Sequence, residues 1–106
     1  MVKAEIPADV IARARQVKLF VMDCDGVLTD GRLYFTDGGE AVKVFHVRDG
    51  QGIVDWHRTG FLSAIISGRN SKIVDLRARE LGIRFVMQGR SDKVAAFNEL
   101  IASAGV

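Results

Sequence analysis

Two aspartates separated by one residue are the feature of this sequence with the clearest capacity for chemistry. Asp23 and Asp25 end a short apolar run, and Gly26 follows them. One carboxylate of such a pair can attack phosphorus and form an aspartyl-phosphate, while the other protonates a leaving oxygen and then deprotonates water. Because anionic carboxylates repel an anionic phosphate, a hard cation such as Mg²⁺ is expected beside them. Gly26 lets the backbone turn sharply and approach the phosphate.

Polar and cationic residues follow the next two apolar segments of the chain. Ser67, Gly68 and Arg69 come directly after the second segment. A serine hydroxyl and adjacent backbone N–H groups suit a phosphoryl oxygen, and an arginine suits a second anionic group on a substrate. Lys93 is expected in the first turn of a helix, where the helix dipole opposes a cation, so an anion in front of it better explains its position.

Each of these motifs also has a plainer explanation. Asp-Gly pairs often cap turns, and Asp-x-Asp-Gly resembles the start of a calcium loop, although the later acidic spacing of such a loop is absent. Ser67 could simply cap a helix, and Lys93 could be an ordinary surface lysine. The order favours the chemical explanation, because each group follows a strand, and ligands bind at the carboxyl ends of strands in open α/β sheets.

The apolar pattern predicts a scaffold that brings these strand ends together. The run over 18–22 is continuously apolar from Leu19 onward rather than alternating, which is typical of a parallel strand covered on both faces. Helices are predicted at 7–14, 50–59 and 70–81, hairpin arms at 33–35 and 41–47, and strands at 61–66 and 83–87. A last helix is predicted from a Ser91 cap onward, with one apolar face made of Val94, Phe97, Ile101 and Ala104. These elements predict one α/β domain over residues 1–106, a three-layer Rossmann-like parallel sheet with a β-hairpin inserted at about 32–47 after the first strand.

The bulk composition excludes several classes of protein. The 106 residues carry 15 basic and 13 acidic side chains, a net charge of +2, and the basic residues form no run, so nucleic acid is not an expected partner. No apolar run approaches the length of a membrane span. The single cysteine, Cys24, cannot form an internal disulfide and fits a reducing compartment such as the cytoplasm.

The order of the motifs resembles a known superfamily. Asp23-x-Asp25-Gly26, then Ser67-Gly68-Arg69, then Lys93 are similar to motifs one to three of the haloacid dehalogenase (HAD) phosphatases. Over nearly the whole chain, including 45–50 and Gln88-Gly89, the sequence resembles the branch that hydrolyses 3-deoxy-D-manno-octulosonate (KDO) 8-phosphate in lipopolysaccharide precursor synthesis; sialic-acid phosphatases are similar here.

This resemblance implies roles for particular residues. It makes Asp23 the nucleophile and an Mg²⁺ ligand, and it gives Asp25 the acid/base role with its backbone oxygen on the metal. Ser67, Gly68 and Lys93 would hold the phosphoryl group, and Arg69 would contact the sugar acid. Two residues near the expected mouth of the site, His46 and Arg48, are further candidates for substrate binding, although Arg48 could simply pair or cap. The hairpins of this branch pair in a homotetramer.

The sequence also departs from the family pattern. The chain stops before the fourth motif, whose acids complete the metal site, so we expect a C-terminally truncated fold, an exposed edge at Leu19–Met22 and little activity from this stretch alone. Two alternatives are a non-catalytic oligomerisation domain derived from the family, and a receiver-like signalling module that accepts a phosphoryl group. The receiver alternative ranks low, because receivers place their acidic pair and their phosphorylated aspartate on different strands.

Overall fold

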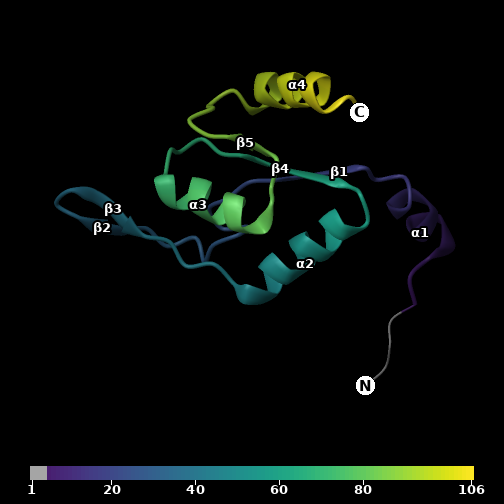
Figure 1. Cartoon of the computed structure of the whole chain (residues 1–106), viewed down its shortest axis with the longest axis horizontal. Coiled ribbons are helices and arrows are strands. Elements are labelled where there is room, and N and C mark those ends of the chain that lie inside the picture. Colours follow the sequence, from purple (N-terminus) through teal and green to yellow (C-terminus); the bar gives the residue numbers. More distant parts are fainter. Residues whose placement is uncertain (1–4) are drawn as a thin grey trace.

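A small parallel sheet forms the middle layer of the computed structural model, which describes residues 5–106 (Figure 1). Its strands, in spatial order, are β1 (Leu19–Met22), β4 (Leu62–Ile66) and β5 (Phe85–Met87). A separate antiparallel hairpin consists of β2 (Tyr34–Thr36) and β3 (Gly39–Val42). The helices are α1 (Ala8–Ala14), α2 (Val47–Arg58), α3 (Lys72–Leu81) and α4 (Lys93–Ala104). The predicted α/β architecture with a hairpin insertion after the first strand is confirmed.

Helices cover both faces of the sheet (Figure 1). On one face, α2 and α3 pack on Met22 and Ile65 through Ile53, Val74 and Ala78. On the other face, α4 packs on the sheet in a second apolar cluster, whose buried members are Ala64, Ile66, Ala96 and Leu100. Because β4 is buried on both sides, four of its five side chains are apolar whichever way they point. The exception is the buried Ser63, whose hydroxyl lies 2.6 Å from Nε2 of His57.

Strand β1 lies at the edge of the sheet. It pairs in parallel with β4, from Leu19 opposite Leu62 to Met22 opposite Ile65, and β4 is its only partner strand among residues 5–106. The side chain of Phe20 is 52% exposed there. The predicted exposed edge is therefore present in the structure.

The start of α2 differs from the start of the helix predicted at 50–59. This helix begins at Val47 rather than Gly50, because the Nδ1 atom of His46 accepts a hydrogen bond from the backbone N–H of Arg48 at 3.0 Å and caps the first turn. The second hairpin arm correspondingly ends at Val42 instead of continuing to 47.

The last helix also differs from the prediction. Asp92, not Ser91, is the cap of α4, and its Oδ1 accepts from the backbone N–H of Ala95 at 3.0 Å. Val94 is 72% exposed and Phe97 44% exposed, so the predicted apolar face is rotated relative to the face that packs on the sheet. By contrast, α3 has the predicted serine cap and the predicted Gly82 in the left-handed conformation. No helix within residues 5–106 is long and apolar enough to cross a membrane.

Candidate active site

The loop after β1 holds two aspartates at the end of the strand. Its backbone folds back at once, since the N–H of Leu28 donates to the carbonyl of Cys24 at 2.8 Å. The hydroxyl of Thr29 accepts from the N–H groups of Gly26 and Gly31, each at 3.2 Å. Gly26 has φ +81°, a conformation that glycine adopts without strain, and this explains why the turn after Asp25 needs that residue.

Asp23 is paired with the lysine that begins α4. Lys93 Nζ donates to Asp23 Oδ2 at 2.7 Å across 70 positions of sequence, and the N–H of Cys24 donates to Oδ1 at 2.7 Å. Burial would raise the pKa of the Asp23 carboxyl, but these two hydrogen bonds and the lysine charge outweigh it and hold the pKa below its ordinary value. Asp23 is thus ionised at neutral pH, as a nucleophilic carboxylate must be.

A hollow opens beside this pair. Its volume is about 210 Å³, and it is lined by Val21, Met22, Asp23, Ile66, Lys93 and Phe97. The carboxylate of Asp23 and the ammonium of Lys93 are its charged groups. A small anionic group in this hollow would therefore meet both the candidate nucleophile and a cation.

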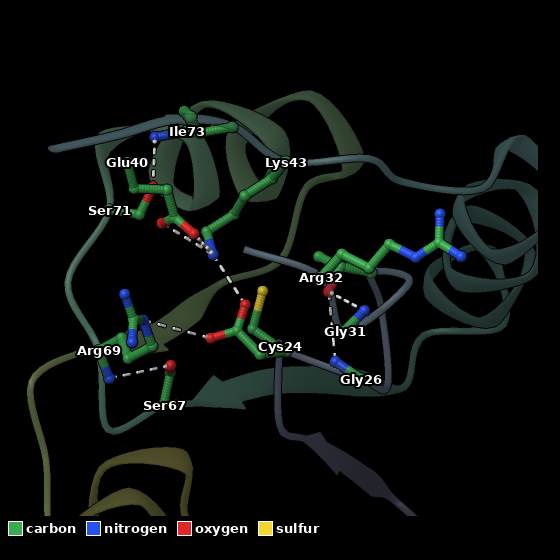
Figure 2. A network of polar contacts seen from close by, with 12 residues as sticks. Cys24, Gly26, Gly31, Arg32, Glu40, Lys43, Ser67, Arg69, Ser71 and Ile73 are labelled. Carbon is green, nitrogen blue, oxygen red and sulfur yellow. Dashed lines mark hydrogen bonds and ion pairs between the residues drawn. The ribbon is translucent and has the colours of Figure 1, made fainter. Parts of the chain in front are cut away.

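Asp25 contacts two other cations, one of which the sequence did not indicate. Lys43 Nζ donates to Asp25 Oδ1 at 2.7 Å and also pairs with Glu40 at 3.1 Å. Arg69 Nε lies 3.9 Å from Asp25 Oδ2. Figure 2 shows Lys43 reaching down beside Glu40, with Arg69 and Ser67 on the opposite side of the same network.

The pKa of Lys43 follows from this pairing. Burial alone would lower the pKa of its ammonium group, but the hydrogen bonds to Asp25 and Glu40 outweigh burial and raise it. Lys43 is therefore a fixed positive charge at neutral pH.

Ser67 is almost completely buried at the end of β4, with 3% of its surface exposed. Its hydroxyl accepts from the N–H of Arg69 at 3.3 Å. The Ser67 N–H donates to the carbonyl of Met87 at 2.8 Å, and the Ser67 carbonyl accepts from the N–H of Arg90 at 3.0 Å. The loop after β4, including the exposed Gly68, is thereby fastened to the loop after β5.

His46 and Arg48 lie on the side of α2. His46 lines a hollow with Leu28, Phe45 and Asp49, and Arg48 lines a separate hollow of about 450 Å³ with Phe20 and Trp56. Among the hydrogen bonds and ion pairs of residues 5–106, none joins either residue to Asp23 or Asp25. The ion pairs of the structure thus join Asp23 with Lys93 and Asp25 with Arg69, and they include neither His46 nor Arg48.

Cys24 has no part in the polar network. Its side chain is 1% exposed and belongs to the core on the α2–α3 face. Burial and the neighbouring charge of Asp25 raise the pKa of its thiol to about 11. Cys24 is therefore a core residue and not a nucleophile, because a nucleophilic cysteine needs a lowered pKa.

The acid pair fits a hard divalent cation in part. Carboxylate and carbonyl oxygens are the ligands that Mg²⁺ prefers, and Asp23 and Asp25 offer both kinds at one strand end. Each carboxylate already attracts an ammonium group at 2.7 Å, which indicates how strongly this corner of the molecule favours positive charge. Within residues 5–106, no group of three or more His, Cys, Asp or Glu side chains gathers as a metal site. The described residues supply part of a coordination shell.

Comparison with known proteins identifies the relatives of this chain. It is 43% identical over 101 residues to 3-deoxy-D-manno-octulosonate 8-phosphate phosphatase of Escherichia coli K12, covering 95% of this chain and 54% of that protein. The crystal structure of the phosphatase of the same name from Moraxella catarrhalis, in complex with magnesium, phosphate and KDO, matches with a TM-score of 0.87 and 41% identity. That match covers 92% of this chain and 56% of the other.

A third match supplies the superfamily. The structure of a HAD superfamily (subfamily III A) hydrolase from Legionella pneumophila matches with a TM-score of 0.87 and 35% identity, over 92% of this chain and 54% of that chain. Over more than nine tenths of its length, this chain is thus similar to a HAD superfamily hydrolase. It spans about half the length of the curated relatives it matches. No family model matches the chain. Its HAD-type motifs lie on the ends of β1 and β4 and at the start of α4.

Proposed function

We propose that this chain carries the nucleophile and phosphate-binding part of a magnesium-dependent phosphatase of sugar-acid phosphates, most specifically KDO 8-phosphate. The observation that carries the proposal is the pairing of Asp23 with Lys93 beside a hollow, with Asp25 two residues away. Its support is the name shared by the relatives in Escherichia coli and Moraxella catarrhalis. The product KDO would enter lipopolysaccharide precursor synthesis.

The first chemical step forms an aspartyl-phosphate. A carboxylate oxygen of Asp23 forms a bond to phosphorus while the bond from phosphorus to the sugar oxygen breaks. Asp25 gives its proton to that leaving oxygen, so the sugar acid departs as an alcohol. Ser67, Gly68 and Lys93 would hold the phosphoryl oxygens during this transfer.

The second step regenerates the protein. Asp25, now a carboxylate, takes a proton from a water molecule whose oxygen forms a bond to phosphorus as the Asp23 oxygen leaves. The sum is one phosphate ester and one water giving one alcohol and one inorganic phosphate. Both aspartates end in their starting states.

The Asp23 carboxylate and the backbone carbonyl of Asp25 would hold Mg²⁺. When bound, the cation neutralises part of the charge that separates the carboxylates from the phosphoryl oxygens. Arg69 would bind the carboxylate of the sugar acid, because a guanidinium pairs with carboxylates in a bidentate geometry. His46 and Arg48 remain proposed substrate contacts.

Self-association through the hairpin is part of the proposal. The hairpin and its flanks expose apolar side chains, namely Leu33 at 44%, Phe35 at 60%, Val42 at 47% and Val44 at 46%. Burial of these groups against other copies would stabilise a homotetramer. A monomer in multi-angle light scattering would count against it.

A buried, unoxidised Cys24 is compatible with the cytoplasm as the location.

Phosphate release tests the function. We expect the chain, extended by the remaining length of its relatives, to release phosphate from KDO 8-phosphate only with Mg²⁺ and to lose release with EDTA, whereas the 106 residues by themselves should release little. Asp23→Asn should abolish release, because the amide is not a nucleophile. Asp37→Asn, a matched change at an exposed acid in the hairpin turn, should leave it unchanged. Release that persists in Asp23→Asn would eliminate the proposed mechanism.

A further inference from the structure

The ammonium group of Lys43 lies between two carboxylates in a nearly closed environment. Its side chain is only 2% exposed, while Glu40 is 11% and Asp25 23% exposed. A lysine is almost never buried to this degree without partners, because removing its charge from water costs several kcal/mol. Its two carboxylate partners supply that compensation. Lys43 is therefore fixed in position by the structure rather than mobile at its surface.

One of the two contacts is explained by the local fold. Glu40 lies in β3 and Lys43 follows the end of that strand, so their ion pair joins neighbours three positions apart. The other contact joins Lys43 to Asp25 across 18 positions, from the hairpin to the loop after β1. The hairpin could be held by the Glu40 pair alone, so the contact with Asp25 calls for its own explanation.

The contact with Lys43 distinguishes the two oxygens of Asp25. Oδ1 accepts from Lys43 at 2.7 Å, a short charge-assisted hydrogen bond. Oδ2 has its recorded ion pair with Arg69 Nε at 3.9 Å, which is beyond hydrogen-bonding length. The two oxygens are thus inequivalent, with Oδ1 held by Lys43 and Oδ2 on the side of Arg69.

We propose that Lys43, itself held by Glu40, is a positioning residue that fixes Oδ1 of Asp25 and so presents Oδ2 to the leaving oxygen of the substrate. The inference rests on the proposed phosphatase function and adds two residues to it. In the first step the proton passes from Oδ2 to the leaving oxygen as the bond between phosphorus and oxygen breaks. In the second step Oδ2 takes the proton of the attacking water. Lys43 touches neither the phosphoryl group nor the sugar, so it acts through Asp25.

Positioning of an acid has a kinetic signature that depends on the leaving group. An alkoxide leaves only with a proton, whereas p-nitrophenolate leaves without one. Hydrolysis of the aspartyl-phosphate is common to both esters, so the contrast is expected in kcat/KM, which reports the steps up to departure of the leaving group. We therefore expect Lys43→Met to lower kcat/KM for KDO 8-phosphate by about 100-fold or more and kcat/KM for p-nitrophenyl phosphate by less than about 10-fold. Glu40→Gln should give a smaller loss with the same preference. Lys18→Met, the same substitution at an exposed lysine before β1, should change neither rate.

A second measurement is independent of turnover. In the chain labelled with ¹⁵N-lysine, the ammonium protons of a 2% exposed Lys43 should exchange slowly with water and give a resolved signal. Asp25→Asn and Glu40→Gln should each shift that signal, and Asp37→Asn should not. Thermal unfolding of every variant would show that each one folds.

The outcomes separate the inference from the function on which it rests. Equal losses of kcat/KM for both phosphate esters in Lys43→Met, or no loss, would overturn the positioning role while leaving the phosphatase proposal intact. If the chain extended to the length of its relatives releases no phosphate from either ester, the proposed function fails, and the ammonium signal alone then decides the arrangement. A Lys43 signal that stays unmoved in Asp25→Asn would overturn the inference in either case.

Discussion

Two glycines in α2 offer a sharp test of packing in this structure, because the same substitution should have opposite effects. Gly50 and Gly52 both lie within the helix. A Cβ atom at Gly52 would have no atom within 4 Å. A Cβ atom at Gly50 would lie 3.1 Å from Leu81 Cδ2 and 3.3 Å from Arg77 Cζ, and closer still to Nη2 of that arginine.

The magnitudes follow from helix propensity and from overpacking. Alanine is favoured over glycine inside a helix by about 0.8–1 kcal/mol, so Gly52→Ala should stabilise the chain by roughly that amount. At Gly50 the same gain is opposed by displacement of Arg77, whose guanidinium lies 5.7 Å from the Phe45 ring and whose side chain is 24% exposed. Overpacking of this kind costs typically 1–3 kcal/mol. The two variants should therefore differ by about 1–3 kcal/mol, with Gly50→Ala the less stable.

Urea unfolding followed by circular dichroism measures this difference, provided that the two variants have the same m-value. A double-mutant cycle isolates the cause: in an Arg77→Ala background the clash with the guanidinium is gone, and Gly50→Ala should become less harmful or stabilising. Equal stabilisation by both alanines in the unmodified background would refute the reasoning. It would mean that Arg77 moves aside at no cost.

Three further predictions follow from burial and charge. The thiol pKa of Cys24 is about 11 rather than 9.0, so its thiolate fraction at pH 8 should be lower by about 100-fold. Iodoacetamide should therefore label Cys24 at least about 100-fold more slowly in the native chain than in urea. Leu100→Ala, at a side chain 1% exposed, should cost about 2–5 kcal/mol in urea unfolding, whereas Val94→Ala, 72% exposed, should change stability by less than about 0.5 kcal/mol. The pKa of Asp23 is lowered in the folded chain, so its pairing with Lys93 stabilises the fold fully above the unfolded pKa of 3.8 and is lost progressively as the pH falls through the folded pKa. Asp23→Asn lacks this carboxyl and should therefore lose less stability than the unmodified chain between about pH 6 and pH 3.

The parallel strands and their order along the chain could be predicted because they have strong local signals. β4 is apolar except at Ser63 since both of its faces are covered, and α3 begins with a serine cap and ends at Gly82. Those signals are carried by the residues themselves, so no knowledge of the partners is required. The motifs at the strand ends were found for the same reason, since each directly follows such a strand.

The contacts of Asp25 could not be predicted in this way. Lys43 follows a short strand in a hairpin whose register shifts between Tyr34 and Phe35, and its partner lies 18 positions earlier. A lysine near a turn gives no sequence signal of burial, because most such lysines are exposed. The only hint was Glu40 three positions earlier, a spacing that also occurs on ordinary surfaces.

The orientation of α4 was missed because pattern alone cannot choose between two apolar stripes. Val94 and Phe97 are large and apolar, yet Ala96 and Leu100 make the contact with the sheet. A small residue at the centre of the interface lets a helix approach a sheet closely, which a count of large apolar residues overlooks. Phe97 instead lines the hollow beside Asp23.

The pairing of Asp23 with Lys93 links substrate binding to the release of the nucleophile. Both carboxylate oxygens of Asp23 are engaged, Oδ1 by the N–H of Cys24 and Oδ2 by Lys93, each at 2.7 Å. The N–H group is fixed in a folded loop, whereas the lysine has a flexible stem and a side chain 49% exposed. On the proposed mechanism, a phosphoryl dianion entering the hollow competes for Lys93, so Oδ2 loses its partner when phosphorus arrives. The oxygen that binding sets free is then Oδ2, and it is the oxygen we assign to the attack.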